Sequence, residues 1–248
     1  ITYGAAVSTA TLSGATTSVT GTFSYDSGAT VPSAGTYAAA VTFTPTGNGG
    51  TANYFTVPLT VNVTVNKATP TVSVTPTYAP MTYGDTLISA NLAGGTASVA
   101  GSFAFNSAGS TPNAGTTSAA VTFTPTDTTN YNTVPVTVAI SVGKDTPSVT
   151  ATPVPTKSPI RFGNTLTQIG LTGGAASVAG SFAYATPSAT PAQGAATVPV
   201  VFTPTDATNY NSVTFNISFT VASATSVITA VNPTSAPQGT SVTLTGTD

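Results

Sequence analysis

Residues 123–132 read Phe-Thr-Pro-Thr-Asp-Thr-Thr-Asn-Tyr-Asn, and residues 202–211 read Phe-Thr-Pro-Thr-Asp-Ala-Thr-Asn-Tyr-Asn. A third version starts at Phe43 and carries three extra residues in the Gly-rich stretch 47–51, before Asn53. An insertion confined to such a stretch is what a surface loop tolerates. Three versions of one long motif predict a tandem repeat.

Three further landmarks repeat at the same spacing, first after 80 residues and then after 79. They are Tyr3, Tyr83 and Phe162, each followed by Gly; Leu12, Leu92 and Leu171, each two residues before a Gly; and Phe23, Phe103 and Phe182, each two residues after a Gly. Agreement between four independent landmarks makes chance repetition very improbable.

The composition predicts an all-β fold. Only 4% of the residues are charged, whereas 40% are hydrophobic and the net charge is −2. Disordered chains combine low hydrophobicity with high net charge, so this chain is expected to fold. Val, Ile, Phe and Tyr alternate with Thr and Ser, which is a strand-forming mixture, and the strong helix formers are scarce.

Period-two alternation predicts several short strands in each copy, as in a small sandwich. In the second copy we expect strands over residues 71–75, 86–92, 101–105, 116–124 and 133–142. Short polar junctions then divide the chain into repeat one (1–66, without its first strand), repeat two (67–143), repeat three (144–222) and a partial segment (223–248). Prolines beside the junctions leave little slack, so we expect semi-rigid, end-to-end neighbours.

The Tyr-Gly opening, the Leu-x-Gly-Gly step, the Gly-x-Phe strand and the long loop motif resemble bacterial Ig-like repeats of the MBG type, also called group three. The tail, with Ile228–Thr240 followed by Val242–Gly246, is similar to the start of an IPT/TIG domain. The resemblance implies tandem Ig-like β-sandwich repeats arranged end to end. It also implies a secreted or cell-surface protein whose repeats act as spacers, adhesive stalks or fibre subunits.

The ionisable residues exclude several classes of function. The acids are Asp26, Asp85, Asp127, Asp145, Asp206 and Asp248, and the bases are Lys67, Lys144, Lys157 and Arg161. Four cations cannot form a nucleic-acid-binding face. Without His or Cys there is no Ser–His or Cys–His nucleophile and no zinc site. Calcium binding through Asp and backbone oxygens, or an unusual Asp-based active site, is what survives this elimination. Against these alternatives we expect no enzyme activity, no catalytic or metal-binding residue and no cofactor.

The most specific local motif is Asp127–Tyr131, repeated as Asp206–Tyr210. Asp and Asn side chains bind nearby backbone amides, so turn stabilisation is favoured over a calcium or sugar contact. Gly47 replaces the Asp in repeat one, which disfavours a shared metal site. Asp85, which follows Tyr83-Gly84, is interpreted in the same way, as a turn residue.

Other candidates have plain structural interpretations. Lys67 and Lys144 stand at junctions and are expected in solvated linkers rather than in Lys–Asn crosslinks. Asn62 and Asn216 match the N-glycosylation sequon, but both fall within expected strands. Tyrosines with less regular positions are the candidates for an exposed sugar-binding surface; they are Tyr25, Tyr37 and Tyr78.

Three functions fit: a subunit of a self-assembling extracellular fibre, sheath or appendage; a monomeric spacer stalk of a surface adhesin; and a carbohydrate-binding module. Soluble β-proteins protect strand edges with charges, of which this chain has few, so self-association is favoured. We also expect contact with a cell surface or matrix, and no membrane insertion.

The two ends suggest a way to associate. The chain opens at Ile1 with no signal peptide or transmembrane run, so it is expected to be a mature or partial segment of a longer protein. One hypothesis is that the tail strand Val227–Asn232 of one copy completes repeat one of the next by strand addition. The alternative is that the segment simply ends there.

Overall fold

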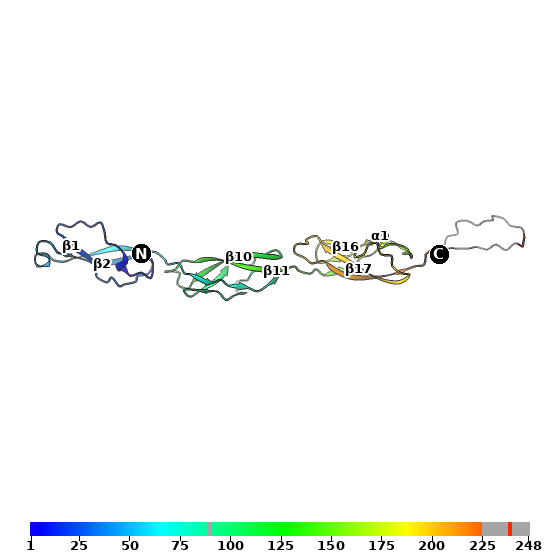
Figure 1. The fold of residues 1–248 in the computed structure, drawn as a ribbon, viewed down its shortest axis with the longest axis horizontal. Coiled ribbons are helices and arrows are strands. Elements are labelled where there is room, and N and C mark those ends of the chain that lie inside the picture. Colours follow the sequence, from blue (N-terminus) through cyan, green and yellow to red (C-terminus); the bar gives the residue numbers. More distant parts are fainter. Residues whose placement is uncertain (89–90, 225–237, 240–248) are drawn as a thin grey trace. The chain divides into compact units, whose positions relative to one another are not determined.

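The computed structural model describes residues 1–88, 91–224 and 238–239. These residues form strands and loops, with short helical turns at η1 (Val7–Thr9), η2 (Gly50–Ala52) and α1 (Leu166–Ile169) (Figure 1). The prediction of an all-β fold is confirmed. The chain divides into two compact units, Ile1–Val142 and Gly143–Asp248.

The first unit contains two antiparallel three-stranded meanders with matching registers. The strands are β1 (Gly21–Tyr25), β2 (Gly35–Pro45) and β3 (Val57–Val65) in one meander, and β9 (Gly101–Phe105), β10 (Gly115–Pro125) and β11 (Val134–Gly143) in the other. Phe23 pairs with Phe43 in the first, and Phe103 pairs with Phe123 in the second. A short strand, β6 (Met81–Thr82), lies beside β11.

Two short ladders form a second layer over the meander of repeat two. In one ladder β4 (Val72–Val74) pairs with β8 (Thr96–Ala97), and in the other β5 (Thr77–Tyr78) pairs with β7 (Leu92–Ala93). Tyr78 and Leu92 pack against the core that includes Val121 and Ile140, both with no exposed surface. The result is a small β-sandwich.

The second unit repeats this arrangement. Its meander is β16 (Gly180–Tyr184), β17 (Gly194–Pro204) and β18 (Val213–Val221), and its ladders pair β12 (Val149–Ala151) with β15 (Ala175–Ala176) and β13 (Val154–Pro155) with β14 (Leu171–Thr172). The Phe182–Phe202 pair takes the same register as the two Phe pairs of the first unit. Leu166, Ile169 and Val200 are fully buried in its core.

One strand prediction for repeat two is wrong. Residues 86–88 form no strand, and the next strand among the described residues, β7, begins at Leu92. The equivalent segment of the second unit is α1, in which Leu166 and Ile169 are both fully buried. Apolar residues three apart share one face of a helical turn, whereas a strand would separate them.

The other strand predictions for repeat two overlap β4, β9, β10 and β11. The alternation along β11 buries Val138, Ile140 and Val142 and exposes the residues between them. The proposed donor strand Val227–Asn232 lies outside the described residues, as does nearly all of the IPT/TIG-like segment 223–248. The Ig-like character of the repeats stays a prediction.

Candidate functional site

The loop between β10 and β11 is held in shape by one carboxylate. Oδ1 of Asp127 accepts hydrogen bonds from the backbone amides of Thr129 at 3.2 Å and Asn130 at 3.1 Å. Oδ2 accepts a third from Nδ2 of Asn130 at 2.7 Å. Asp127 therefore makes the turn-stabilising bonds that the sequence predicts.

The same loop is bonded to the junction that leads into repeat two. The amide of Ala68 donates to the carbonyl of Asn130 at 2.9 Å, and the amide of Asn132 donates to the carbonyl of Ala68 at 2.9 Å. Nζ of Lys67 donates to the carbonyl of Thr128 at 2.6 Å. Lys67 is exposed, as expected for a linker residue, but its ammonium group is bound by the loop.

Asn130 also connects repeat two to repeat one. Its Oδ1 accepts a hydrogen bond of 2.8 Å from the backbone amide of Ala34, which lies just before β2. Asn130 is only 8% exposed. Because Asp127 holds the Nδ2 group of the same amide, the Oδ1 atom is turned towards Ala34. We call residues 127–131, together with Ala34 and Tyr3, the junction clasp.

The neighbouring tyrosine adds an apolar contact to the junction clasp. The ring of Tyr131 lies 5.3 Å from the ring of Tyr3, centroid to centroid, with the planes at 85°. This edge-to-face arrangement is favourable for aromatic rings. Repeat one therefore contacts the loop of repeat two through a hydrogen bond and a ring pair.

The electrostatics of the loop favour the ionised carboxylate. The hydrogen bond from the Asn130 side chain lowers the pKa of Asp127 below its ordinary value of 3.8. The two backbone amides and the charge of Lys67 act in the same direction, and partial burial opposes them. Asp127 is therefore charged at neutral pH, and its bonds to the loop are charge-assisted.

Repeat three builds its loop in the same way. Asp206 accepts from the amides of Thr208 and Asn209, both at 3.2 Å, and from Nδ2 of Asn209 at 2.7 Å. Nζ of Lys144 donates to the carbonyl of Ala207 at 2.6 Å. The Asn209 hydrogen bond lowers the pKa of Asp206 as well.

Repeat one departs from this pattern at the predicted position. Gly47 stands where the other repeats have Asp, and Asn53 is exposed. Nδ2 of Asn53 donates instead to the carbonyl of Asn48 at 2.8 Å. Asn48 itself has a positive φ of 51°. The longer loop is therefore closed by its own backbone, without a carboxylate.

Two further polar residues stabilise turns. Oδ2 of Asp85 accepts from the amide of Thr82 at 2.9 Å. Oδ1 of Asn164, at the equivalent position, accepts from the amide of Arg161 at 3.1 Å. An Asp and an Asn that make the same bond support the turn interpretation, because the charge is dispensable there.

The three candidate tyrosines for sugar binding are half-buried. The hydroxyl of Tyr25 donates to the carbonyl of Ala10 at 3.3 Å, and Tyr37 packs against the core of repeat one. Tyr78 lies edge-to-face with Phe105. These side chains serve packing and do not form one exposed platform.

The sequon residues Asn62 and Asn216 are exposed on β3 and β18. Within residues 1–88 and 91–224, no three acidic, His or Cys side chains gather closely enough to hold a metal ion. In the same part of the chain, no helix is long and apolar enough to span a membrane.

Sequence reasoning assigned Asp127 and Asn130 to their own turn and missed the bond to Ala34. That bond joins residues 96 positions apart, so no local pattern reports it. An Ala-Gly pair stands at the start of β2 and of β10, at Ala34-Gly35 and Ala114-Gly115, but at β17 the pair is Gln193-Gly194, so this pattern does not report the bond either.

Fold and junction together define a class of protein: an all-β repeat protein built from small sandwiches with a bonded contact between repeats one and two. No protein-family model matches the chain. No curated protein matches it either.

Proposed function

We propose that this chain is a structural protein of the cell exterior, a subunit of a self-assembling fibre, sheath or surface appendage, with no catalytic activity. The observation that carries the proposal is the bond from Ala34 to Asn130, in which a side chain of one repeat is oriented for the backbone of the other. A hydrogen-bonded contact of this kind suits a structural protein that must keep neighbouring repeats at a fixed distance from each other.

The junction clasp would act by limiting bending between repeats one and two. One intramolecular hydrogen bond contributes about 0.5–1.5 kcal/mol, and one edge-to-face ring pair contributes a similar amount. Together, the free energies of these two contacts are small compared with the stability of a domain but several times the thermal energy. The contact therefore favours one arrangement of the two repeats without preventing reversible opening.

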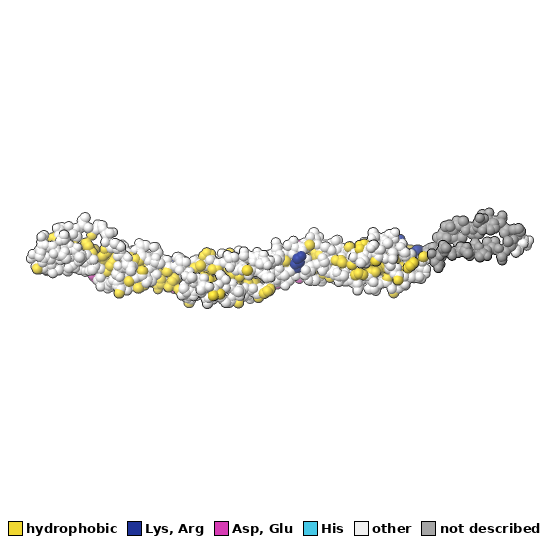
Figure 2. All heavy atoms as spheres, in the orientation of Figure 1, with side chains coloured by type: hydrophobic (Ala, Val, Ile, Leu, Met, Phe, Trp, Pro, Cys, Tyr) yellow, Lys and Arg dark blue, Asp and Glu magenta, His cyan; other side chains and the backbone are white. Residues whose placement is uncertain are grey.

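Surface chemistry supports assembly between copies. Figure 2 shows a face in which apolar atoms are scattered among uncharged polar ones and charged atoms are rare. With four cations and six anions in 248 residues, electrostatic repulsion between copies is weak. Scarcity of Lys and Arg also leaves few sites for trypsin-like proteases, as suits a long-lived extracellular material.

The second candidate is a monomeric spacer that holds an adhesive domain away from the cell. The junction clasp serves this function equally well, because spacing needs stiffness but no self-association. Sugar binding has no comparable support, since the three candidate tyrosines are half-buried.

Negative-stain electron microscopy of the purified chain at neutral pH, with and without calcium, tests the proposal. Regular fibres under both conditions are the expected result. Isolated particles at every concentration would contradict self-assembly and favour the monomeric spacer. Fibres that form only with calcium would point to a metal-mediated contact in place of a direct one.

A further inference from the structure

Two tyrosines of different repeats lie against each other at the junction of repeats one and two. The ring of Tyr3 is 5.3 Å from the ring of Tyr131, centroid to centroid. Both residues are half-buried, so solvent reaches part of each. Two phenols this close together can undergo a reaction that neither undergoes alone, which is oxidative coupling to dityrosine.

The backbone of the junction holds this pair in place. The amide of Tyr3 donates to the carbonyl of Asn66 at 2.8 Å, and Ala68, two residues further along, forms a β-bridge with Tyr131. The amide of Tyr131 donates to the carbonyl of Asp127 at 3.2 Å, within the loop that the Asp127 carboxylate stabilises. Both tyrosines are therefore attached to one short stretch of chain, and their proximity does not depend on the ring contact alone.

The composition directs oxidation towards tyrosine. The sequence has no Cys, Trp or His, and its single methionine, Met81, is buried. Cysteine and methionine are side chains that oxidants commonly attack. With cysteine absent and methionine buried, a phenol is the most easily oxidised side chain that solvent reaches.

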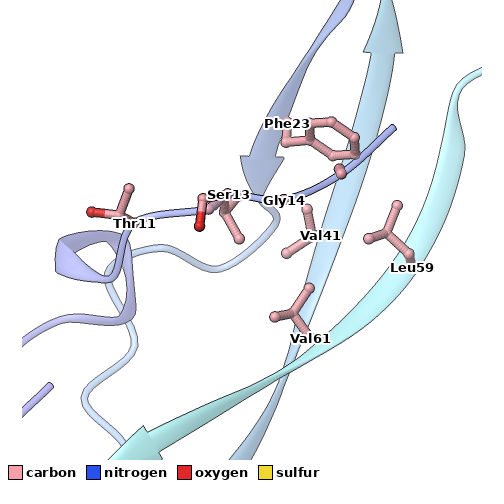
Figure 3. Close-up of a pocket in the computed structure, with 9 residues that line it drawn as sticks. Thr11, Ser13, Gly14, Phe23, Val41, Leu59 and Val61 are labelled. Carbon is pink, nitrogen blue, oxygen red and sulfur yellow. The ribbon is translucent and has the colours of Figure 1, made fainter. Parts of the chain in front are cut away.

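Phenylalanine makes other ring contacts of the same repeat, and its ring cannot form a phenoxyl radical. Phe23 lies 4.9 Å from Phe43, centroid to centroid. Figure 3 shows Phe23 on the meander of repeat one, at a cavity of about 280 Å³ that is also lined by Val41, Leu59 and Val61. These side chains serve packing, whereas the pair of Tyr3 and Tyr131 also carries two reactive hydroxyl groups.

We propose that Tyr3 and Tyr131 form a modification site, at which oxidation creates a covalent dityrosine link between repeats one and two. The oxidant is hydrogen peroxide, used by a peroxidase that is separate from this chain. The inference goes beyond the proposed function and does not require self-assembly, because the link lies within one chain.

The coupling removes one hydrogen atom from each tyrosine. Each phenol loses an electron and its hydroxyl proton, which leaves a phenoxyl radical whose unpaired spin is shared with the ring carbons Cε1 and Cε2. A carbon–carbon bond forms between one such atom of each ring, and the hydrogen on each of these carbons then moves to the oxygen and restores the phenol. The two electrons and two protons reduce one molecule of hydrogen peroxide to two of water.

The link would make the junction clasp permanent. The hydrogen bond from Ala34 to Asn130 opens reversibly, whereas a carbon–carbon bond between the rings does not. Coupling within the pair is favoured over coupling between copies, because two groups held in contact react as if each were highly concentrated around the other. A permanent link suits the fibre subunit and the monomeric spacer equally, since both need a fixed spacing between repeats.

Oxidation of the full-length chain by hydrogen peroxide and a haem peroxidase tests the proposal. Trypsin digestion of the unfolded product cuts after Lys67, so Tyr3 and Tyr131 fall in different peptides. Mass spectrometry should find these two peptides joined with the loss of two hydrogen atoms, and fragmentation should place the link at the two tyrosines. A mixture of ¹⁵N-labelled and unlabelled chains should give joined peptides of a single isotope, because the link forms within a chain.

Tyr3→Phe and Tyr131→Phe should each lower the yield of the joined peptides about tenfold or more, since one partner then lacks the hydroxyl that forms the radical. Repeat three has Phe162 at the position of Tyr3, so the fold accepts phenylalanine there. Tyr54→Phe is the matched control, because Tyr54 is exposed on the loop of repeat one, and it should leave the yield unchanged. Circular dichroism before oxidation should be the same for all three variants as for the parent.

The outcomes distinguish this proposal from self-assembly, which electron microscopy of the unoxidised chain measures separately. A yield that is unchanged in Tyr3→Phe would overturn the proposal, because the link then involves another tyrosine. Joined peptides that carry both isotopes would overturn it as well, since the link would then lie between copies. Tyrosine oxidation without joined peptides would show that the pair does not couple.

Discussion

A glycine starts the first strand of each meander, and the ring that lies over it explains why. A Cβ atom on Gly101 would lie 2.5 Å from Cζ of Phe123 and 2.5 Å from the carbonyl O of Thr124. A Cβ atom on Gly21 would lie 2.4 Å from Cζ of Phe43, and one on Gly180 would lie 2.5 Å from Cζ of Phe202. The Gly-x-Phe motif is therefore a packing requirement, because the missing side chain makes room for a buried ring.

Gly101→Ala should destabilise repeat two by about 1–3 kcal/mol, since an added methyl group must displace a buried ring or the backbone. Chemical denaturation followed by tyrosine fluorescence measures the change in the free energy of unfolding. Ser102→Ala, at the next and exposed position, should stay within about 0.5 kcal/mol of the parent. Equal effects at both positions would contradict the packing argument.

The charge of Asp127 should make the junction clasp sensitive to acid. Folding lowers the pKa of Asp127 below 3.8, so its contribution to stability is complete above pH 3.8 and is lost as pH falls through the lower, folded-state pKa. A pH titration that follows the side-chain amide of Asn130 by NMR should show this transition. In Asp127→Asn the transition should disappear, and its persistence would assign the titration to another group.

At the scale of elements, a short helical turn in repeat three depends on its cap. Oγ1 of Thr165 accepts from the amide of Gln168 at 3.3 Å, and Oε1 of Gln168 accepts from the amide of Thr165 at 3.0 Å. This reciprocal arrangement is a capping box. It allows a four-residue helix to insert Leu166 and Ile169 into the core, although so short a helix is unstable alone.

Thr165→Ala should therefore cost about 1 kcal/mol of the stability of repeat three. Thermal unfolding monitored by circular dichroism should show a lower melting temperature for the corresponding transition. Ser181→Ala, exposed on β16, provides the comparison and should leave the transition in place. An unchanged melting temperature in Thr165→Ala would mean that packing alone holds the turn.

At the scale of the molecule, the junction clasp should couple the motions of repeats one and two. Asn130→Ala removes the acceptor for Ala34, so the two repeats should tumble more independently, as measured by ¹⁵N relaxation. Asn132→Ala is a closely matched control. It removes bonds to Thr69 and to the carbonyl of Lys67, all local to the start of repeat two, and should leave the coupling intact.

If Asn130→Ala and Asn132→Ala change the relaxation data to the same extent, the loop stabilises only the start of repeat two and does not couple repeats one and two. Retention of coupling in Asn130→Ala would shift the explanation to the ring pair of Tyr3 and Tyr131. The double variant Asn130→Ala with Tyr131→Ala would then be the decisive comparison, because it removes both contacts.

The amino-acid sequence alone determined the all-β class, the 80- and 79-residue periods, the inward face of β11 and the turn made by Asp127. The periods come from comparing the copies with one another, and the other features depend on neighbours within a few residues, where alternation and turn chemistry act. Only the tertiary structure decided that Asn130 reaches Ala34 and that Leu166 and Ile169 enter the core on a helical turn. Each of these depends on groups distant in the sequence, whose proximity exists only after the chain has packed.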